Sequence, residues 1–319
     1  MADVVGAPGR IVAQGLRAFD VVGTWAEATE REVHADPFQR DPAFLARLLP
    51  WMEVLARYFD ATVEGLGHVP ARGPVLLVGN HSGGILTPDT SVFFTAWYRR
   101  FGLERPLVAL AFDAAFGVPG FRTLMRKIGE VPANRENARR ALRAGHPVLV
   151  YPGGDHEVFR PWRDRNRIDF GGRTGFVELA LRERVPVVPV VSHGGHDSTI
   201  ILTRGEWLGR WLGLERIRTP SFPLALQIPW GVSPVGLPAW PLPAKITIRV
   251  LPAMKWRSLP RTAADDRSVV TACHREITER MQDALGDLAA AHPYPVLTRL
   301  RSLLPSWRAS DRRPEPEVS

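Results

Sequence analysis

The stretch PVLLVGNHSGGILTPDTSVFFTAWYRRFG, residues 74–102, carries the local pattern that decides the fold. Residues 74–80 are almost all aliphatic, which predicts a strand buried on both faces. A turn with two glycines follows, and Thr87 and Pro88 then stand as a candidate N-cap and a first helical residue. The stretch therefore predicts a strand, a glycine turn and a helix in succession.

The same alternation of strand and helix continues along the chain. Strands are predicted within 105–112, 146–152, 185–192 and 244–252, and helices within 119–129, 136–145, 171–184 and 263–291. Strands that alternate with helices favour a parallel sheet with helices on its faces. We therefore expect an α/β fold with a mostly parallel central sheet flanked by helices and an N-terminal helical extension.

Three regions are expected from these patterns. Residues 1–60 form the N-terminal helical extension, residues 61–295 the main domain, and residues 296–319 a basic, disordered tail. In the extension, an amphipathic helix is predicted around 10–33, and a second helix over 42–59 that Pro50 should kink or split. The second helix either packs on the core or lies at a membrane interface.

Composition limits the classes of function. The formal charge of +8 suits nucleic acid, anionic lipid or an acidic ligand, but basic residues are not interleaved with aromatic ones, which speaks against nucleic acid. Cys273 is the single cysteine, so an internal disulfide is excluded, and it lies on the apolar face of the predicted last helix. With no apolar run of about 18 residues and no signal-peptide core, the protein is expected in the cytosol or on a membrane surface.

Four predicted strand or helix ends are followed by polar turns. They read NHSGG from residue 80, GEVPANR from 129, YPGGDHE from 151 and VSHGGHDS from 191. In open α/β sheets, ligands bind beyond the carboxyl ends of the strands. His193, His196 and Asp197 in the last turn have metal-like spacing, but a structural or substrate-lining role is favoured over a metal site.

His81 is the candidate general base, because its ordinary pKa lies near neutral pH. A base of this kind needs a carboxylate to hold one ring nitrogen protonated, and Asp89 is the candidate. Asp89 could equally serve to stabilise the start of the following helix. Neither a G-x-S-x-G nucleophile motif nor a nucleotide-binding glycine motif occurs.

Jointly, the first three of these turns and the VPVVPV of residues 185–190 resemble the glycerolipid acyltransferase superfamily, of the lysophosphatidic acid acyltransferase type. The resemblance spans about residues 60–200 and includes the literal VPVVPV of 185–190. Two positions depart from the family pattern: the family's aspartate would fall at Leu86, three residues before Asp89, and Gly153 replaces the glutamate of the third block. The Pro-Gly-Gly at this block, with Glu157 beyond it, looks like the diacylglycerol acyltransferase branch.

The resemblance implies an O-acyltransferase that moves a fatty acyl group from acyl-CoA or acyl carrier protein to a hydroxyl of a lysophospholipid or other glycerolipid. His81 and Asp89 would be catalytic, without a metal or other cofactor. The residues implied in substrate binding are Asn80, Gly83, Gly84, Arg135, Gly153, Gly154 and Glu157. The expected location is peripheral, on the cytoplasmic face of an anionic membrane.

Other readings of the sequence remain open. His81 could activate water in an ester or thioester hydrolase, or the chain could be a catalytically degenerate lipid-binding protein. The segment 204–243, rich in tryptophan and proline, could cover the core, roof an acyl-chain groove or enter a membrane interface.

Overall fold

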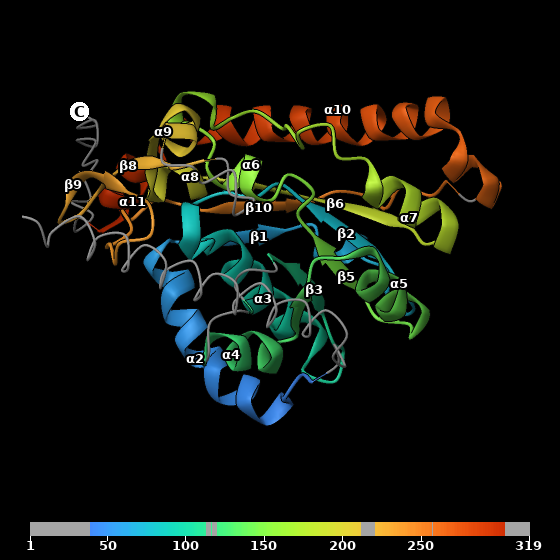
Figure 1. Cartoon of the computed structure of the whole chain (residues 1–319). Helices are drawn as coiled ribbons and strands as arrows, with labels where there is room; N and C mark the ends of the chain where they lie inside the picture. The colour runs from blue at the N-terminus through green and yellow to red at the C-terminus, as the bar shows by residue number, and fades with distance from the viewer. Residues whose placement is uncertain (1–38, 113–115, 117–119, 212–220, 257, 304–319) are drawn as a thin grey trace, which may run out of the picture.

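The computed structural model describes residues 39–112, 116, 120–211, 221–256 and 258–303 (Figure 1). A seven-stranded sheet forms its centre, with the strand order β1-β10-β6-β2-β5-β3-β4. The strands are β1 Thr62–Glu64, β2 Leu76–Gly79, β3 Val108–Ala111, β4 Glu130–Pro132, β5 Val148–Val150, β6 Val187–His193 and β10 Thr247–Val250. Strands β2 to β6 run parallel, whereas β10 pairs antiparallel to β6 and parallel to β1. The expected mostly parallel sheet is confirmed.

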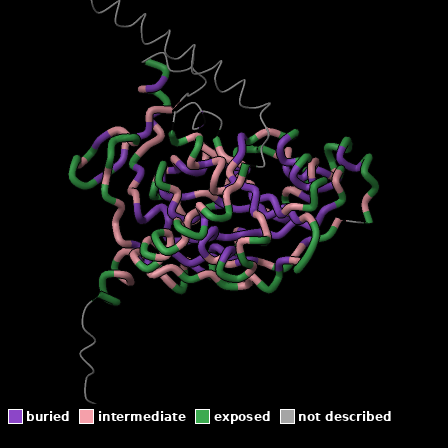
Figure 2. Tube along the Cα trace, turned by 90° about the horizontal axis from the view of Figure 1, so that it is seen from below, coloured by how far each residue is buried: buried purple, intermediate pink, exposed green. Residues whose placement is uncertain are grey.

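Helices cover both faces of this sheet (Figure 1). On one face lie α2 Pro42–Tyr58, α3 Pro88–Phe101 and α4 Phe121–Ile128, and on the other α5 Arg135–Arg143, α7 Gly175–Glu183 and α10 Arg267–Ala291. Strand β2 shows why an aliphatic run was needed. Leu76 and Val78 enter the core beneath α7 and α10, and Leu77 enters the core beneath α3. The purple stretches of Figure 2 show this buried interior running through the molecule.

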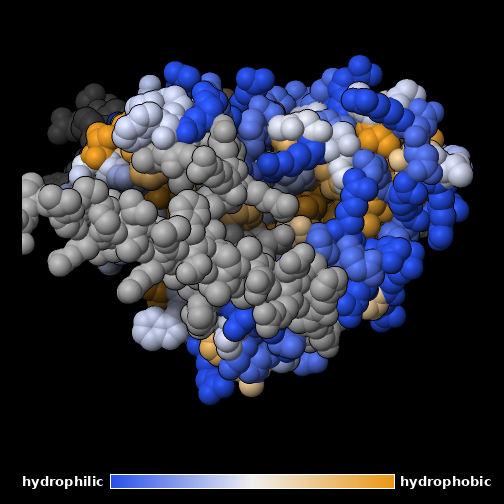
Figure 3. All heavy atoms as spheres, in the orientation of Figure 1, coloured by the Kyte–Doolittle hydropathy of each residue, from blue (hydrophilic) through white to orange (hydrophobic). Residues whose placement is uncertain are grey.

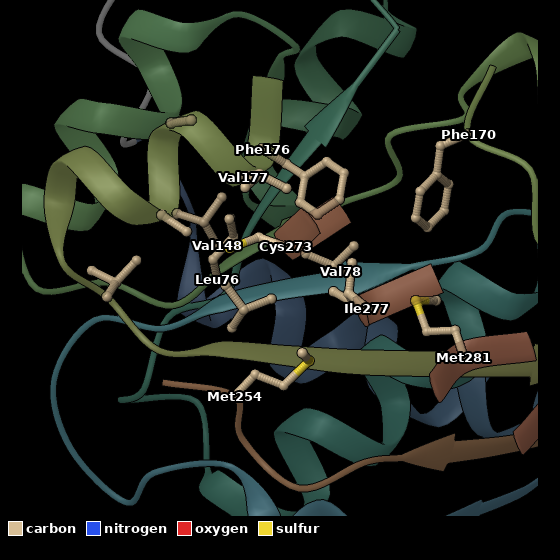
Figure 4. Packing of buried hydrophobic residues seen from close by; sticks show 14 of the residues in the cluster. Leu76, Val78, Val148, Phe170, Phe176, Val177, Met254, Cys273, Ile277 and Met281 are labelled. Carbon is tan, nitrogen blue, oxygen red and sulfur yellow. The ribbon is translucent and has the colours of Figure 1, made fainter. Parts of the chain in front are cut away.

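Figure 4 shows the larger of the two cores, in which Cys273 packs beside Leu76, Val148 and Phe176. The face predicted for the last helix is buried in full: Val270, Cys273, Ile277, Met281, Ala284, Leu285 and Leu288. Cys273 is therefore a small core residue, as its position in the pattern indicates.

Short elements gather at the carboxyl ends of the parallel strands. They include α6 Asp155–Val158, α8 Gly195–Ser198 and the 3₁₀ turn η2 Gly84–Leu86; the other 3₁₀ turns are η1 Leu66–His68, η4 Trp162–Asp164 and η6 Arg261–Asp265. A separate three-stranded antiparallel sheet, β7 Ile200–Thr203, β8 Leu224–Gln227 and β9 Gly231–Pro234, lies beyond this end of the molecule (Figure 1). Helices α9 Glu206–Trp211 and α11 Pro295–Leu303 complete the described residues.

Three local expectations differ from the structure. Helix α2 is not split at Pro50, because burial of Leu45 and Phe59 fixes the chain on both sides and Pro50 itself is exposed. Thr87 stands at the N-cap position of α3, as expected, but its side chain makes no capping hydrogen bond and its backbone is left-handed, with φ of 38°. Residues 296–303 are helical rather than disordered, since α11 is held where Arg299 donates to the carbonyls of Arg57 and Tyr58.

Helix α2 takes the core-packed position of the two considered, because it lies against α3 and α4. The predicted helix at 10–33 and the tail from 304 lie outside the described residues. Among the helices that the structure describes, none is both long and apolar enough to cross a bilayer.

Candidate active site

The site lies where β2, β5 and β6 end. His81 follows β2, the YPGG turn and α6 follow β5, and α8 follows β6, so three of the predicted turns meet at one edge of the sheet. Strand β2 is the switch point of the topology, because the chain leaves it toward β3 on one side and returns to β6 on the other. Crevices at such points are where open α/β sheets bind ligands.

His81 and Asp89 form a close pair. The Nδ1 of His81 lies 3.2 Å from Oδ2 of Asp89, and Asp89 is buried at the start of α3. Asp89 lies three residues beyond the position that the family pattern gives its aspartate, and η2, which spans three residues, takes up most of that excess as one tight turn. Gly83 and Gly84 allow it with φ of 87° and 64°, and Thr87 adds the third left-handed residue.

Asp89 is held in place by more than the histidine. Its Oδ2 accepts hydrogen bonds from the backbone N–H of Ser82 at 2.8 Å and from the Ser82 hydroxyl at 3.3 Å. Its Oδ1 accepts from the N–H of Thr90 at 2.8 Å. These donors fix the position of the carboxylate at the start of the helix. The two roles weighed for Asp89, partner of His81 and stabiliser of the helix start, therefore coexist in one geometry.

Tyr151 fixes the plane of the His81 ring by stacking on its face. The two rings stack with centroids 4.1 Å apart and planes 11° apart. This stacking requires glycine at position 79, since a Cβ there would lie 2.5 Å from Cε1 of Tyr151. The chain after the adjacent parallel strands β2 and β5 thus supplies His81 and the ring that orients it.

Glu157 holds the main chain of the same histidine through a hydrogen bond. Its Oε2 accepts from the backbone N–H of His81 at 3.2 Å, and its Oε1 forms an ion pair with Nη2 of Arg160 at 2.9 Å. Complete burial raises the pKa of Glu157 to about 7, against the lowering effect of Arg160 and the N–H donors.

The glycine at position 153 and the glutamate at position 157 depend on each other. A Cβ at Gly153 would lie 2.1 Å from Cγ of Glu157, so the Glu157 side chain occupies the space beside residue 153. The departure at the third block is therefore compensated: the carboxylate comes from four residues further along the chain.

The remaining candidates next to His81 are Asn80 and the glycines of the two turns. Asn80 links strand ends, because its side chain donates to the carbonyl of Ser192 and accepts from the Ser192 N–H, both at 2.8 Å. The N–H of Gly154 donates to the carbonyl of Tyr151 at 3.0 Å. Within the described part of the chain, the N–H groups of Gly83 and Gly84 donate to no other group.

Arg135 is paired with a glutamate of α7. It is the first residue of α5, beyond the edge strand β4, where its exposed guanidinium pairs with Glu178 at 2.8 Å. Arg173 is the cation that meets the glycine turn, since it donates to the carbonyls of Pro152 and Gly153 at 3.2 and 2.6 Å and pairs with Asp155 at 2.7 Å. The structure thus brings His81, Asp89, Glu157 and the glycine turns together, and gives Arg135 an ion pair with Glu178 of α7.

The fourth turn packs directly on the loop that carries His81. A Cβ at Gly195 would lie 2.1 Å from Oγ of Ser82, so α8 touches the loop. His196 is buried, and neither of its ring nitrogens has a hydrogen-bond partner among the described residues. Asp197 accepts from the indole N–H of Trp162 at 3.0 Å. The described residues contain no cluster of three or more side chains suited to a metal ion.

Sequence reasoning missed Tyr151, Arg160 and Arg173. The first had a usable signal, because it is the first residue after β5, at the same sheet edge as His81. Arg160 had one as well, since a glutamate and an arginine three residues apart lie on one side of a helical turn. Arg173 had none, because its contacts with the glycine turn depend on how the connection to α7 folds back.

The chain is similar to known acyltransferases. A family model for acyltransferases matches residues 60–193, which contain the first three turns and the VPVVPV of residues 185–190. An uncharacterized protein of Mycobacterium tuberculosis (strain ATCC 25618 / H37Rv) is 31% identical over 273 residues, covering 85% of this chain and 74% of that protein. The Bos taurus DGAT1/2-independent enzyme synthesizing storage lipids is 30% identical over 174 residues, covering 54% and 50%.

One solved structure is also similar. It is the crystal structure of the 1-acyl-sn-glycerophosphate (LPA) acyltransferase PlsC from Thermotoga maritima, at a TM-score of 0.48 and 15% identity, covering 86% of this chain and 98% of that one. The family resemblance noted in the sequence is confirmed by the family model and the relatives. The chain belongs to the acyltransferase family, within the glycerolipid acyltransferase superfamily.

Proposed function

We propose that this protein transfers a fatty acyl group from acyl-CoA to a hydroxyl of a lysophospholipid or another glycerolipid, with His81 as general base. The observation that carries the proposal is the His81–Asp89 pair at 3.2 Å beyond the end of β2. An ionised carboxylate can only accept hydrogen bonds, so Nδ1 carries the proton and Nε2 is left to accept one.

The reaction follows from that tautomer. Nε2 of His81 takes the proton of the acceptor hydroxyl while the oxygen attacks the thioester carbonyl. The tetrahedral intermediate then collapses, the C–S bond breaks, and the leaving thiolate takes the proton back from the imidazolium. The N–H groups of Gly83 and Gly84, which have no internal acceptor in the described residues, are suited to stabilise the oxyanion.

An arginine-rich cleft supports acyl-CoA as the donor. A cavity of about 410 Å³ lies between residues 160–169 and 203–210, with Trp207 in its wall. Five arginines line it against three carboxylates: Arg160, Arg163, Arg167, Arg204 and Arg210 against Asp164, Asp169 and Glu206. Guanidinium groups bind phosphates with paired hydrogen bonds, and an indole can stack on an adenine. Arg160 connects this cleft to His81 through Glu157.

The membrane location is part of the same proposal. We place the protein peripherally on the cytoplasmic leaflet, where anionic lipids attract basic proteins. The formal charge of +8 supports this placement, and a glycerolipid acceptor would be met there.

The test is acyl transfer by the purified full-length protein. Labelled acyl-CoA is incubated with lysophospholipid or diacylglycerol in vesicles, and products are identified by mass spectrometry. Because general base catalysis contributes typically about 10²–10⁴-fold, His81→Ala should lower kcat/KM by that factor without loss of folded structure. His68→Ala, which changes an exposed histidine of η1, is the matched control.

Three outcomes would contradict the proposal. Normal turnover by His81→Ala would exclude the base. Release of free fatty acid from acyl-CoA without an acceptor, and no acylated lipid, would indicate a hydrolase. Acyl-CoA binding with no turnover by the wild type would indicate a lipid-binding protein.

A further inference from the structure

The segment that supplies β8 and β9 of the smaller sheet has an unusual composition. Residues 221–244 include three phenylalanine and tryptophan side chains and no charged residue. They form β8, β9 and the loop that follows, at the end of the molecule next to α8 (Figure 1). An uncharged stretch of this kind is expected to be buried in a water-soluble fold.

The β8–β9 hairpin buries its polar residues and exposes its apolar ones. Gln227 and Ser233 are 8% and 7% exposed, and their side chains hydrogen-bond to each other at 2.9 Å. Leu226 and Val232, which are paired across the two strands, both point outward. A sheet with one face in water normally shows the opposite arrangement, so the outer face of this hairpin is not built for water.

This face is larger than one pair of residues. We call it the hairpin surface, formed by the exposed side chains of Leu226, Ile228, Trp230, Val232, Leu237 and Trp240. Hydrophobic atoms are visible at that end of the molecule in Figure 3. It continues to the active site, because Gly236 lies against the exposed Ile85 of η2, in the loop between His81 and Asp89.

The rim of the hairpin surface carries positive charge and more tryptophan. Strand β7 pairs with β8 and leads through Arg204 into α9, which exposes Trp207, Arg210 and Trp211. Tryptophan beside arginine is the composition that proteins place at the level of lipid headgroups. An uncharged apolar centre with a basic rim is complementary to an anionic bilayer, with its apolar interior and negative surface.

We propose that the hairpin surface inserts into the bilayer interface and so places the His81 site at the membrane, where a lipid acceptor can enter past Ile85. The role of the lipid as substrate rests on the proposed function, but insertion itself does not. Among the possible positions of the 204–243 segment, this proposal selects the membrane interface.

The chain offers a closely matched test. Trp230 and Val232 of the hairpin surface are 53% and 63% exposed, and Trp51 and Val54 of α2 are 73% and 51% exposed. Trp230→Gln/Val232→Gln and Trp51→Gln/Val54→Gln therefore remove the same two side chains from two surfaces. Each full-length variant is floated with vesicles of phosphatidylcholine containing phosphatidylglycerol, and with vesicles of phosphatidylcholine alone.

The hairpin variant should bind the anionic vesicles at least about tenfold more weakly than wild type, and the α2 variant should bind them like wild type. Trp230 also donates a hydrogen bond to the carbonyl of Pro238. Leu226→Gln/Val232→Gln, whose side chains make no hydrogen bond in the described residues, should therefore reproduce the loss, with an unchanged melting temperature.

Wild-type flotation by both hairpin variants would overturn the proposal, as would a loss confined to the α2 variant. A third outcome would also overturn it: the wild type sediments as a dimer, the hairpin variants sediment as monomers, and vesicle binding is unchanged. The hairpin surface would then join two copies of the chain. Flotation does not depend on turnover, so a failure of acyl transfer leaves this result readable. If transfer occurs, the hairpin variants should acylate a water-soluble short-chain acceptor at the wild-type rate.

Discussion

Gly153 shows how a single residue can depart from a family pattern without removing the chemical group. The family's glutamate is absent at this position, yet a buried carboxylate lies beside it, contributed by Glu157. That carboxylate holds the main chain of His81 and neutralises Arg160. His81 is therefore positioned by three groups: Asp89, the Tyr151 ring and Glu157.

A double-mutant cycle tests the dependence of these two positions on each other. Gly153→Ala places a methyl group on Cγ of Glu157, which must then move, and we expect a cost of about 1–3 kcal/mol in the free energy of unfolding. In a Glu157→Ala background the obstacle is gone, so the same substitution should cost little. Urea unfolding of the four proteins gives the coupling energy. Equal costs in both backgrounds would show that the two positions are independent.

At the scale of the elements, regular patterns could be predicted and irregular connections could not. The strand at 74–80 and the buried face of α10 follow from side-chain periodicity, and both are found. The path from His81 to Asp89 depends on three left-handed residues, including Thr87, for which periodicity carries no signal. The sequence supplied the two residues of the pair, but their distance required the fold of η2.

The same limit applies to α2 and α11. Pro50 argues locally against a continuous helix, and the charged end of the chain argues locally for disorder. Both arguments were overridden by tertiary contacts: α2 is anchored in the core around Leu45 and Phe59, and α11 is tied to the end of α2 through Arg299.

Helix α8 gives a prediction about pH. Burial, with the charges of Arg160, His81 and Arg165, lowers the pKa of His196 to about 3. Between that value and the ordinary 6.5, the unfolded chain binds more protons, so stability falls as the pH drops below 6.5. From pH 7 to 5 the loss from His196 should be about 2 kcal/mol.

Urea unfolding at these two pH values, for wild type and His196→Asn, isolates that contribution. The loss on acidification should be smaller in the variant by about 2 kcal/mol. His193, whose pKa burial lowers to about 4, contributes a loss of the same sign to both proteins and cancels in the comparison. An identical pH dependence in the two proteins would mean that His196 titrates normally.

At the scale of the whole molecule, two surfaces of different chemistry meet at the His81 site. The hairpin surface reaches it through Ile85, and the arginine-rich cleft reaches it through Arg160 and Glu157. The first suits acyl chains and lipid, and the second suits phosphate groups. A thioester donor with a polyphosphate handle could therefore be held in the cleft while its carbonyl meets an acceptor that comes from the membrane side.

This arrangement predicts a separation of kinetic effects. Arg167→Ala/Arg210→Ala removes two exposed guanidinium groups from the cleft that have no acidic partner among the described residues. Loss of charge-assisted hydrogen bonds to the donor's phosphates should raise KM for acyl-CoA by about tenfold or more with little change in kcat. Acyl-pantetheine, which lacks the nucleotide, should show the same kinetics with variant and wild type.

Arg47→Ala/Arg72→Ala is the control, since it removes two exposed arginines on α2 and at the start of the β2 segment. It changes the net charge by the same amount, so a general electrostatic effect on donor encounter would appear in both variants. A cleft variant with wild-type KM for acyl-CoA would remove the cleft as the donor site. A second outcome would assign the donor role to acyl carrier protein: the enzyme uses acyl carrier protein rapidly and accepts acyl-CoA no better than acyl-pantetheine. The nucleotide of CoA would then add nothing to recognition.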